Sequence, residues 1–218
     1  MNHPNLTWTD QETPVSTMFD DPYFTGGLEE TQHVFLAGND LPARLRDGFH
    51  VAELGFGTGL NLLALAALWS GTGMLHYTSF EAFPLRAQDM QRALAPFALP
   101  AAAALVAQWD ASVGAIRRID LPGVRADIHI GDARQTVPAW QGRADAWFLD
   151  GFAPARNPDL WGEALLHQVA AHTMAGGTLA TYTAAGHVRR ALADAGFEVT
   201  RVPGYGRKKH MTIARMPG

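Results

Sequence analysis

Acidic residues stand at four places where an apolar, strand-like run of this sequence ends, and their positions suggest a binding site. These residues are Glu53, Glu81, Asp132 and Asp150. In open α/β sheets, ligands bind outside the carboxyl ends of the strands, so we expect the four carboxylates to face one site. Glu81 lies about 20 residues past a glycine turn, where a carboxylate can accept hydrogen bonds from both hydroxyls of a ribose. For Asp132, a helix N-cap is an equally good interpretation.

The glycine turn occupies residues 55–59, which read GFGTG. A strand-like run at residues 51–54 precedes the turn, and a pattern rich in Leu and Ala starts at residue 60. Glycines allow positive φ and a close approach of the backbone to a ligand, and the N–H groups at a helix start attract electron-rich groups. The spacing differs from the G-x-G-x-x-G of dinucleotide-binding folds, so a tight strand-to-helix turn of any α/β protein would also fit.

The turn carries no pattern for gripping phosphates. The sequence has no G-x-x-x-x-G-K-[ST], and no Lys or Arg occurs within residues 55–69. A nucleoside without phosphates therefore fits better than a pyrophosphate cofactor. S-adenosylmethionine is such a ligand, with a ribose for Glu81, an adenine near Asp132 and a sulfonium cation that acids tolerate. The candidate cofactor-binding residues are Glu53, Gly55, Phe56, Gly57, Thr58, Gly59, Asn61, Glu81, Asp132 and Asp150.

Strand-like and helix-like segments alternate from residue 49 onward, and this order must position the acids. We expect strands at residues 49–54, 75–83, 144–150, 178–183, 197–202 and 210–215. Residues 115–119 and 124–130 flank a Leu-Pro-Gly turn and predict a hairpin or two strand segments. We expect helices at residues 28–37, 58–69, 84–94, 101–109, 160–174 and 186–195, and a short helix or loop at residues 132–140. Such alternation predicts a mostly parallel α/β sheet covered by helices on both faces.

Composition narrows the class of protein. The chain has 218 residues, 47% of them hydrophobic, which is enough for one sizeable core. No apolar run reaches the roughly 18 residues of a membrane span, and the N-terminus lacks the pattern of a secretory signal. The sequence has no cysteine, which excludes disulfides, thiolate metal sites and cysteine nucleophiles and favours a cytoplasmic location. Its 9 histidines form no H-x-x-x-H pair, so we expect no metal site.

Charge is distributed unevenly between the two halves of the chain. Residues 1–110 contain 4 Lys or Arg and 12 Asp or Glu, whereas residues 111–218 contain 13 and 9. A basic half in a chain of net charge −4 can indicate a face that binds a polyanion, although ordinary surface charge is the simpler interpretation. The N-terminal residues 1–27 are polar with scattered aromatics, and we expect them to pack against the domain as extended chain with turns.

Four stretches make this sequence similar to a known family. They read FDDPYF at residues 19–24 with GLEET at 27–31, GFGTGLN at 55–61, WFLDGFAPARNPDLW at 147–161 and GYGRKK at 204–209. Residues 53–59 resemble motif I of the seven-strand S-adenosylmethionine-dependent methyltransferases. Together the four stretches resemble the methyltransferase domain of the MnmC/MnmD type, in order and over almost the whole chain. DGFAPARNPDLW is the most specific of them, and the glycine turn the least.

This resemblance implies a fold and a reaction. The fold is a Rossmann-like methyltransferase fold, with a mostly parallel seven-stranded sheet and helices on both faces. Residues 1–48 are then an N-terminal elaboration packed on the core, and residues 49–218 the methyltransferase domain, together forming one structural domain. The implied reaction is S-adenosylmethionine-dependent methylation of the exocyclic amine of 5-aminomethyl-(2-thio)uridine at the tRNA wobble position. The implied partners are the tRNA anticodon loop and a flavin-dependent oxidase of the same pathway, which in two-domain members follows in the same chain.

Methyl transfer to an amine needs alignment and a proton acceptor rather than a metal. Asp150 is the candidate catalytic acceptor, because it ends a strand beside an aromatic residue. A wobble base lies in a single-stranded loop, so aromatic side chains can stack on it and basic side chains can contact the phosphates. The candidate substrate-binding residues are Phe24, Glu30, Phe152, Asn157, Arg207 and Lys208.

Two alternatives stay open at this point. A small-amine methyltransferase or an aminopropyltransferase on the same fold would have an enclosed acidic pocket, and its substrate affinity would not depend on salt. A binding module that keeps the cofactor pocket without catalysis would bind RNA but show no activity. A tRNA enzyme would instead have an open basic rim and a steep salt dependence.

Overall fold

A central eight-stranded sheet forms the frame of the protein in the computed structural model, which describes residues 3–111 and 114–218. Its strands are β4 (His50–Leu54), β5 (Leu75–Glu81), β6 (Ile116–Leu121), β7 (Val124–Ile130), β8 (Ala144–Leu149), β9 (Thr173–Thr181), β10 (Glu198–Pro203) and β11 (His210–Arg215). Their spatial order is β10-β11-β9-β8-β4-β5-β7-β6. The five strands from β9 to β7 pair in parallel, and strands β6, β10 and β11 pair antiparallel at the two edges.

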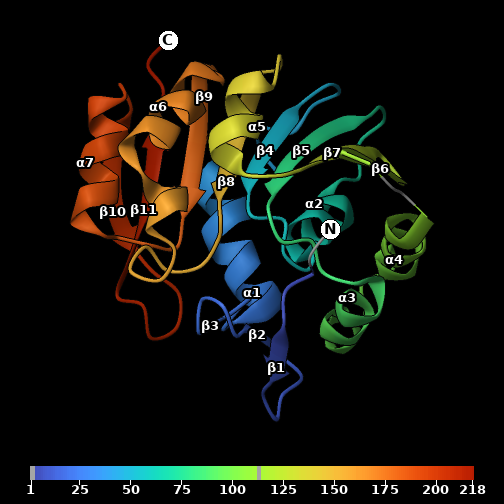
Figure 1. Cartoon of the computed structure of the whole chain (residues 1–218). Coiled ribbons are helices and arrows are strands. Elements are labelled where there is room, and N and C mark those ends of the chain that lie inside the picture. Colours follow the sequence, from blue (N-terminus) through green and yellow to red (C-terminus); the bar gives the residue numbers. More distant parts are fainter. Residues whose placement is uncertain (1–2, 112–113) are drawn as a thin grey trace.

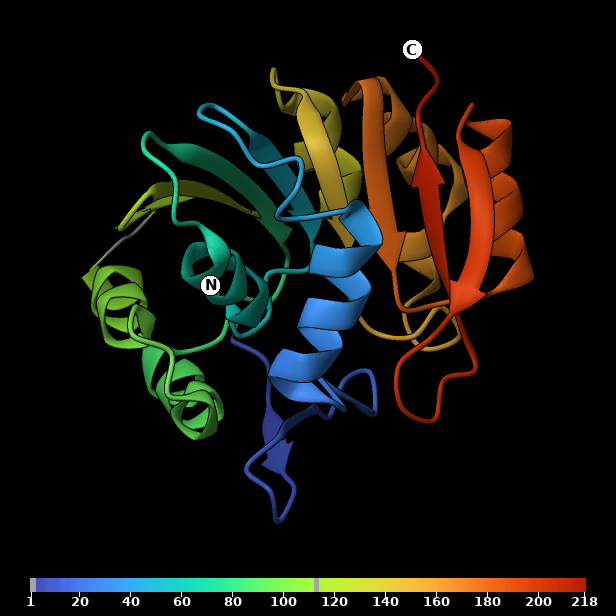
Figure 2. The same ribbon diagram turned by 180° about the vertical axis from the view of Figure 1, so that it is seen from behind.

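Helices cover both faces of this sheet, as the alternating pattern predicted. They are α1 (Gly27–Thr31), α2 (Leu60–Leu68), α3 (Ala87–Leu94), α4 (Ala102–Ala111), α5 (Ala133–Ala139), α6 (Glu163–Ala171) and α7 (Gly186–Asp194). Helices α5, α6 and α7 lie on the face seen in Figure 1, whereas α1 and α2 lie on the face seen in Figure 2. A separate apolar cluster fills the space under each layer, with Leu166 and Val188 in one and Leu62 and Val34 in the other. The α/β fold is therefore confirmed.

The sheet has eight strands, so the expected number of seven was wrong. The additional strand is β6, which pairs antiparallel with β7 at the edge of the sheet. Residues of β6 alternate between exposed and buried, as a half-buried edge strand requires, and Gly123 adopts a φ of 73° in the turn to β7. The pattern on both sides of Leu121-Pro122-Gly123 is thus a hairpin.

Two expected helices differ from those in the structure. The segment expected as a helix over residues 160–174 begins within a 3-10 turn at Pro158–Trp161 and contains the shorter helix α6, and β9 already begins at Thr173. Gly176 has a φ of 72° inside β9, near a register shift in the pairing with β8, so the two glycines lie in an irregular strand instead of ending a helix.

The helix expected over residues 28–37 extends from Gly27 to Asn39 and changes its winding on the way. Helix α1 passes into a π-helical turn at Gln32–Leu36 and a 3-10 turn at Ala37–Asn39. This run lies close against the sheet, since a Cβ on Gly38 would come within 2.8 Å of the Cβ of Ala180. Asn39 is buried and donates hydrogen bonds to the carbonyls of Phe35 and Trp147.

The N-terminal residues form a small three-stranded antiparallel sheet beyond the carboxyl ends of the central strands (Figure 1). Its strands are β1 (Leu6–Trp8), β2 (Pro14–Ser16) and β3 (Asp21–Pro22). The Arg92 guanidinium of α3 lies 4.1 Å from the ring centroid of Trp8, and the carboxylate of Asp21 accepts a hydrogen bond from the backbone N–H of Ala153. The segment is thus held on two sides. Within residues 3–111 and 114–218, no helix is long and apolar enough to cross a membrane.

Candidate functional site

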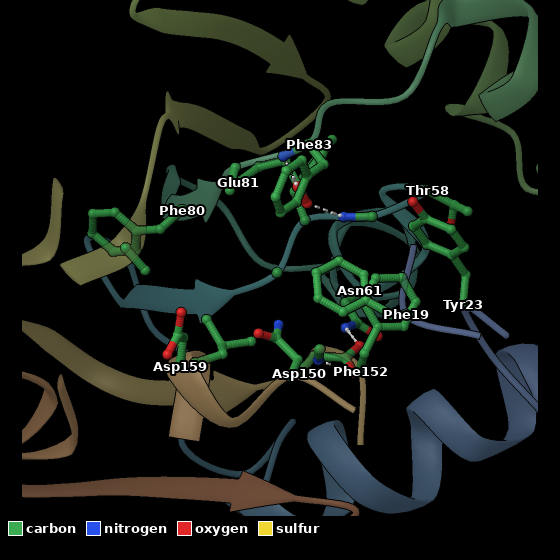
Figure 3. Close-up of a pocket in the computed structure, with 18 of the residues that line it drawn as sticks. Phe19, Tyr23, Thr58, Asn61, Phe80, Glu81, Phe83, Asp150, Phe152 and Asp159 are labelled. Atoms are coloured by element: carbon green, nitrogen blue, oxygen red, sulfur yellow. Dashed lines mark hydrogen bonds between the residues drawn. The ribbon is translucent and has the colours of Figure 1, made fainter. Parts of the chain in front are cut away.

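A cavity of about 560 Å³ opens at the carboxyl ends of the central strands, where the acids were expected to meet. Its walls come from the N-terminal segment 18–24, the glycine turn, the end of β5, the start of α5 and the loop after β8. Figure 3 shows side chains from these distant segments pointing toward one space. Its volume is in the range of small-molecule and cofactor sites, about 300–1,000 Å³.

The glycine turn forms the floor between β4 and α2, and its conformation depends on glycine. Gly55, Gly57 and Gly59 have φ values of 84°, 53° and 80°, a region that other residues rarely adopt. A Cβ on Gly55 would lie 2.8 Å from the carbonyl oxygen of Asp150, so the turn also needs glycine to approach the end of β8. The turn therefore brings the backbone N–H groups at the start of α2 next to the loop that carries Asp150.

Glu81 faces this turn from the end of β5. Its carboxylate accepts hydrogen bonds from the backbone N–H of Gly57 at 2.9 Å and of Phe83 at 2.7 Å (Figure 3). Burial raises the pKa of Glu81, and the N–H donors oppose that shift. Each carboxylate oxygen can accept a further hydrogen bond. This geometry suits the two hydroxyls of a ribose, the role expected for Glu81 from its position in the sequence.

Asp150 lies across the cavity and shares a hydrogen-bonding partner with Glu53. The side-chain amide nitrogen of Asn61 donates to Asp150 Oδ2 and to Glu53 Oε1, both at 2.8 Å. The second oxygen of Asp150 accepts from the N–H of Gly151, and the second oxygen of Glu53 accepts from the Ser79 hydroxyl. Burial raises the pKa of Asp150 to about 7. Burial, and then the charge of Asp150, raise the pKa of Glu53 to about 8.

Asp132 acts as the N-cap of α5, the alternative that the sequence left open. Its carboxylate accepts a hydrogen bond from the backbone N–H of Arg134 at 2.9 Å, and it also pairs with the Arg134 guanidinium. The same guanidinium reaches Asp159 at 2.9 Å. Hydrogen bonds from Arg134 lower the pKa of Asp132, which stays ionised beside the cavity. Asp132 thus closes one end of the cavity together with Arg134 and Asp159.

Aromatic side chains cover the opposite side of the cavity. Phe19, from the N-terminal segment, stacks on Phe152 with ring centroids 4.6 Å apart and meets Phe83 edge to face at 5.6 Å. Tyr23 packs edge to face against Phe152 at 5.0 Å, and Phe24 against Phe97 at 5.4 Å. An ion pair between Asp20 and Arg156, at 2.8 Å, holds the N-terminal segment on the loop after β8. The aromatic cover therefore depends on contact between the N-terminal segment and the DGFAPAR loop.

A second contact joins α1 to the loop at residues 204–209. The Lys208 ammonium lies 2.8 Å from Glu30 Oε1 and 3.9 Å from the ring centroid of Tyr182. The other oxygen of Glu30 accepts from the backbone N–H groups of Thr25 and Gly26, and these donors with Lys208 lower the pKa of Glu30 against its burial. The Tyr182 hydroxyl donates to the carbonyl of Gly151 at 2.7 Å. Lys208 thus stands beside the Asp150 loop, whereas Arg207 is exposed.

Most of the sequence-derived site residues line this one cavity. They are Gly55, Phe56, Gly57, Thr58, Asn61, Glu81, Asp132, Asp150, Phe24, Phe152 and Asn157. Those that lie outside the lining are Glu53, Gly59, Glu30, Arg207 and Lys208. Glu53 is fully buried beneath Asn61 and has no surface to offer a ligand, because it lies one layer below the turn. Gly59 instead packs against Leu105 and Phe56, where a Cβ would clash.

Sequence reasoning did not assign site roles to several residues that line the cavity. Thr31, Phe19 and Tyr23 lie within the quoted FDDPYF and GLEET stretches, so that motif was the available signal. Phe83 and Arg134 lie two residues after the strand-end acids Glu81 and Asp132, a position that places them at the same edge of the sheet. Among the described residues, no group of three His, Asp or Glu side chains is arranged to hold a metal ion.

The groups that line the cavity fit S-adenosylmethionine. The cavity offers a buried carboxylate for a ribose, backbone N–H groups at the start of α2, an apolar aromatic cover and carboxylates that a sulfonium cation tolerates. A family model described as S-adenosyl-L-methionine-dependent methyltransferase matches residues 98–217, which is more than half of the chain.

Known proteins resemble the chain over nearly its whole length. It is 47% identical over 230 aligned positions to the tRNA 5-methylaminomethyl-2-thiouridine biosynthesis bifunctional protein MnmC of Caulobacter sp. strain K31. It is 45% identical to the corresponding protein of Caulobacter vibrioides. Each alignment covers 98% of this chain and 38% of the relative, so the chain spans well under half the length of these curated relatives.

Among solved structures, MnmC2 from Aquifex aeolicus has the same fold. The two structures superpose with a TM-score of 0.74 at 24% sequence identity, over 100% of this chain and 73% of the other. The fold, the cavity and the family match agree with one another, and the chain belongs to the family of S-adenosyl-L-methionine-dependent methyltransferases.

Proposed function

We propose that this chain methylates the exocyclic amine of 5-aminomethyl-(2-thio)uridine at the wobble position of tRNA, giving the 5-methylaminomethyl base. The observation that carries the proposal is Asp150, a half-buried carboxylate that lines the cavity beside Phe152, within a chain 47% identical to a bifunctional tRNA 5-methylaminomethyl-2-thiouridine biosynthesis protein. S-adenosylmethionine, when bound, supplies an electrophilic methyl group. The substrate amine must be neutral to accept it, and it must then lose a proton.

We assign the proton-accepting role to Asp150. Asn61 and the N–H of Gly151 each hold one of its oxygens, which fixes the carboxylate in the cavity wall. Its pKa of about 7 leaves a large fraction ionised near neutral pH while keeping its affinity for a proton close to the working pH, where general bases are most effective. The developing positive charge on the amine also favours the ionised form of Asp150.

Cofactor binding falls to the residues around the glycine turn. Glu81 would accept from the ribose hydroxyls, and the backbone from Gly55 to Asn61 would lie against the methionine part. Asp132 and Arg134 would close the end of the cavity that takes the adenine. Glu53 would act from below by holding Asn61 rather than by contacting the cofactor.

Substrate binding falls to the other side. Phe152 and Phe24 offer faces for stacking a flipped base, and Asn157 lies in the same wall. Exposed Arg207 and the neighbouring Lys208 would contact RNA phosphates near the cavity. A tRNA substrate also implies action in the cytoplasm, alongside a flavin-dependent oxidase that processes the same base. We further propose that residues 1–48 and 49–218 work as one structural domain.

The decisive assay mixes the purified chain with S-adenosylmethionine and tRNA that carries the 5-aminomethyl wobble base. We expect one methyl group per tRNA, recovered as the 5-methylaminomethyl nucleoside by mass spectrometry. Matched tRNA with an unmodified wobble uridine, and the isolated nucleoside, are the controls. Methylation of the nucleoside or of small amines at a rate equal to that of tRNA, without salt dependence, would replace the tRNA assignment with a small-amine enzyme.

A further inference from the structure

We propose that Thr31 positions the catalytic carboxylate Asp150 through Asn61, so that helix α1 of the N-terminal elaboration is part of the machinery that accepts the proton. The inference rests on the proposed function in one respect, since it takes Asp150 as the proton acceptor. Thr31 is not itself a catalytic residue in this account. It acts by fixing the group that fixes Asp150.

The three side chains form one continuous hydrogen-bonded chain. The Thr31 hydroxyl donates to Asn61 Oδ1 at 2.9 Å, and Asn61 Nδ2 donates to Asp150 Oδ2 at 2.8 Å. The second N–H of the same amide donates to Glu53 Oε1. Thr31 is 4% exposed and Asn61 6% exposed, so water competes little for these bonds.

The orientation of the Asn61 amide follows from its neighbours. An ionised carboxylate can only accept, whereas the Thr31 hydroxyl can donate. When Asp150 is ionised, the amide must turn its nitrogen toward Asp150, which leaves its oxygen to accept from Thr31. The second N–H of that nitrogen then reaches a carboxyl oxygen of Glu53. Without the Thr31 donor, Asn61 Oδ1 becomes a buried acceptor that has lost its partner, and the amide is free to shift away from Asp150.

The position of Thr31 is set from both sides of α1. Its neighbour Glu30 accepts from the backbone N–H groups of Thr25 and Gly26 and pairs with Lys208. The start of the helix is therefore fixed to the loop at residues 204–209, while Thr31 on the next position reaches into the cavity wall. A rigid α1 can thus hold Asn61 in place in a way that a flexible N-terminal tail could not.

Charged and titratable groups surround Asp150 on several elements, and each influences its proton affinity. Glu53 of β4 shares the Asn61 amide, and Glu30 of α1 and Lys208 of the 204–209 loop act from a distance with opposite signs. Tyr182, the residue after β9, donates a hydrogen bond to the carbonyl of Gly151. Thr31 changes none of these charges. A shift produced by a Thr31 substitution therefore reports on the Asn61 contact alone.

The test compares Thr31→Val, which keeps the shape and loses the hydroxyl, with Thr31→Ser, which keeps the hydroxyl. The first readout is a carboxyl-carbon NMR titration of the full chain with S-adenosylhomocysteine, in which Asp150→Asn identifies the Asp150 resonance. We expect Thr31→Val to raise the pKa of Asp150 by roughly half a unit, because its charged form loses part of a hydrogen bond. Thr31→Ser should titrate like the wild type.

The second readout is the pH profile of methyl transfer at saturating tRNA. The acidic limb of this profile should move to higher pH by the same half unit in Thr31→Val, so that kcat is about twofold lower at neutral pH and about threefold lower at acidic pH, with KM for tRNA within about twofold. Unchanged titration in Thr31→Val, or an equal shift in Thr31→Ser, would overturn the positioning role, even if both variants melt earlier. If Thr31→Val does not fold, Thr31→Ala carries the same expectation.

The NMR titration needs no tRNA, which separates this proposal from the proposed function. A shifted Asp150 titration in a chain that does not methylate aminomethyl tRNA would uphold the Thr31 contact and reject the tRNA assignment. A normal titration in an active enzyme would reject the Thr31 contact and leave the tRNA assignment standing.

Discussion

The two sides of the cavity are built by different means. The cofactor wall, residues 55–61 and 80–83, is held by backbone groups, such as the N–H of Gly57 on Glu81 and the close approach of Gly55 to the Asp150 carbonyl. The substrate rim, residues 18–31, 150–161 and 204–209, is held by side-chain contacts between segments far apart in the chain. Examples are Asp20 with Arg156 and Glu30 with Lys208.

This difference predicts that the two sides can be impaired separately. A backbone-built wall keeps its shape when a single side chain changes, so substitutions there should alter affinity for one ligand group at a time. A rim built from ion pairs and stacked rings should respond to substitutions on any of its segments, because each segment is positioned by the others. Asp150 lies where wall and rim meet, and it is the one residue whose loss should stop the reaction while leaving both ligands bound.

The largest effect is therefore expected for Asp150→Asn. The amide keeps the size of the side chain but cannot accept the proton, so single-turnover methyl transfer should fall by about 10²–10⁴. Affinity for S-adenosylmethionine and for tRNA, measured by calorimetry and filter binding, should stay within a few fold. The exposed Asp194→Asn serves as the matched control. A variant that lost cofactor affinity in proportion to its rate would show that Asp150 belongs to the cofactor wall only.

Glu81→Gln should weaken cofactor binding at the cofactor wall without changing tRNA binding at the substrate rim. One backbone N–H, from Gly57 or Phe83, would then face an amide N–H instead of a carboxylate oxygen, and the ribose would lose a charged acceptor. Hydrogen bonds to charged groups contribute about 1.5–3 kcal/mol, which corresponds to a cofactor affinity roughly 10- to 100-fold weaker. Calorimetry checks this, with tRNA affinity in the absence of cofactor as the control. Unchanged cofactor affinity would exclude the ribose role.

The pH dependence of methyl transfer tests the role of Asp150, the residue between the two sides of the cavity. In its proposed role Asp150 must be deprotonated, and its pKa is about 7, so the rate should rise with pH up to that value. Below it, the rate should fall about tenfold for each pH unit. Single-turnover rates across neutral pH measure this limb. This rise of the rate with pH should be absent from the residual activity of Asp150→Asn. A rise that persists in this variant would come from deprotonation of the substrate amine.

The smallest effects are expected on the substrate rim. Lys208→Met should raise KM for tRNA several-fold, since it removes the proposed phosphate contact and the partner of Glu30. Exposed Arg207→Ala should weaken tRNA binding less and lower the slope of log affinity against log salt by about one. Cofactor affinity should not change in either variant. Equal losses for tRNA and for cofactor would show that the rim and the wall are not independent.

The same division explains how much of the molecule the sequence could predict. The strands, the glycine turn and Glu81 follow from local patterns, because a strand end and the turn after it are neighbours in sequence. The contacts of Lys208 with Glu30 and of Phe19 with Phe152 join residues from opposite ends of the chain, and no local pattern encodes them. The strand expected at residues 178–183 overlaps the end of β9, but the first part of β9, residues 173–177, was missed because it contains Gly176 and Gly177, and glycines often end helices.

The buried carboxylates have a consequence for folding. The pKa values of about 7 for Asp150 and about 8 for Glu53 exceed the value of roughly 4 for these groups in an unfolded chain, so the folded state holds more protons. Their contribution to the free energy of unfolding is fully present below about pH 4 and is lost as the pH rises through about 8. Each unit by which the pKa in the folded state exceeds the pKa in the unfolded chain corresponds to about 1.4 kcal/mol. A melting series across this range should show the loss, and it should shrink in Glu53→Gln. The ionised form, which we propose accepts the substrate proton, is thus the less stable form of the fold, and a bound cation would restore part of the stability that ionisation removes.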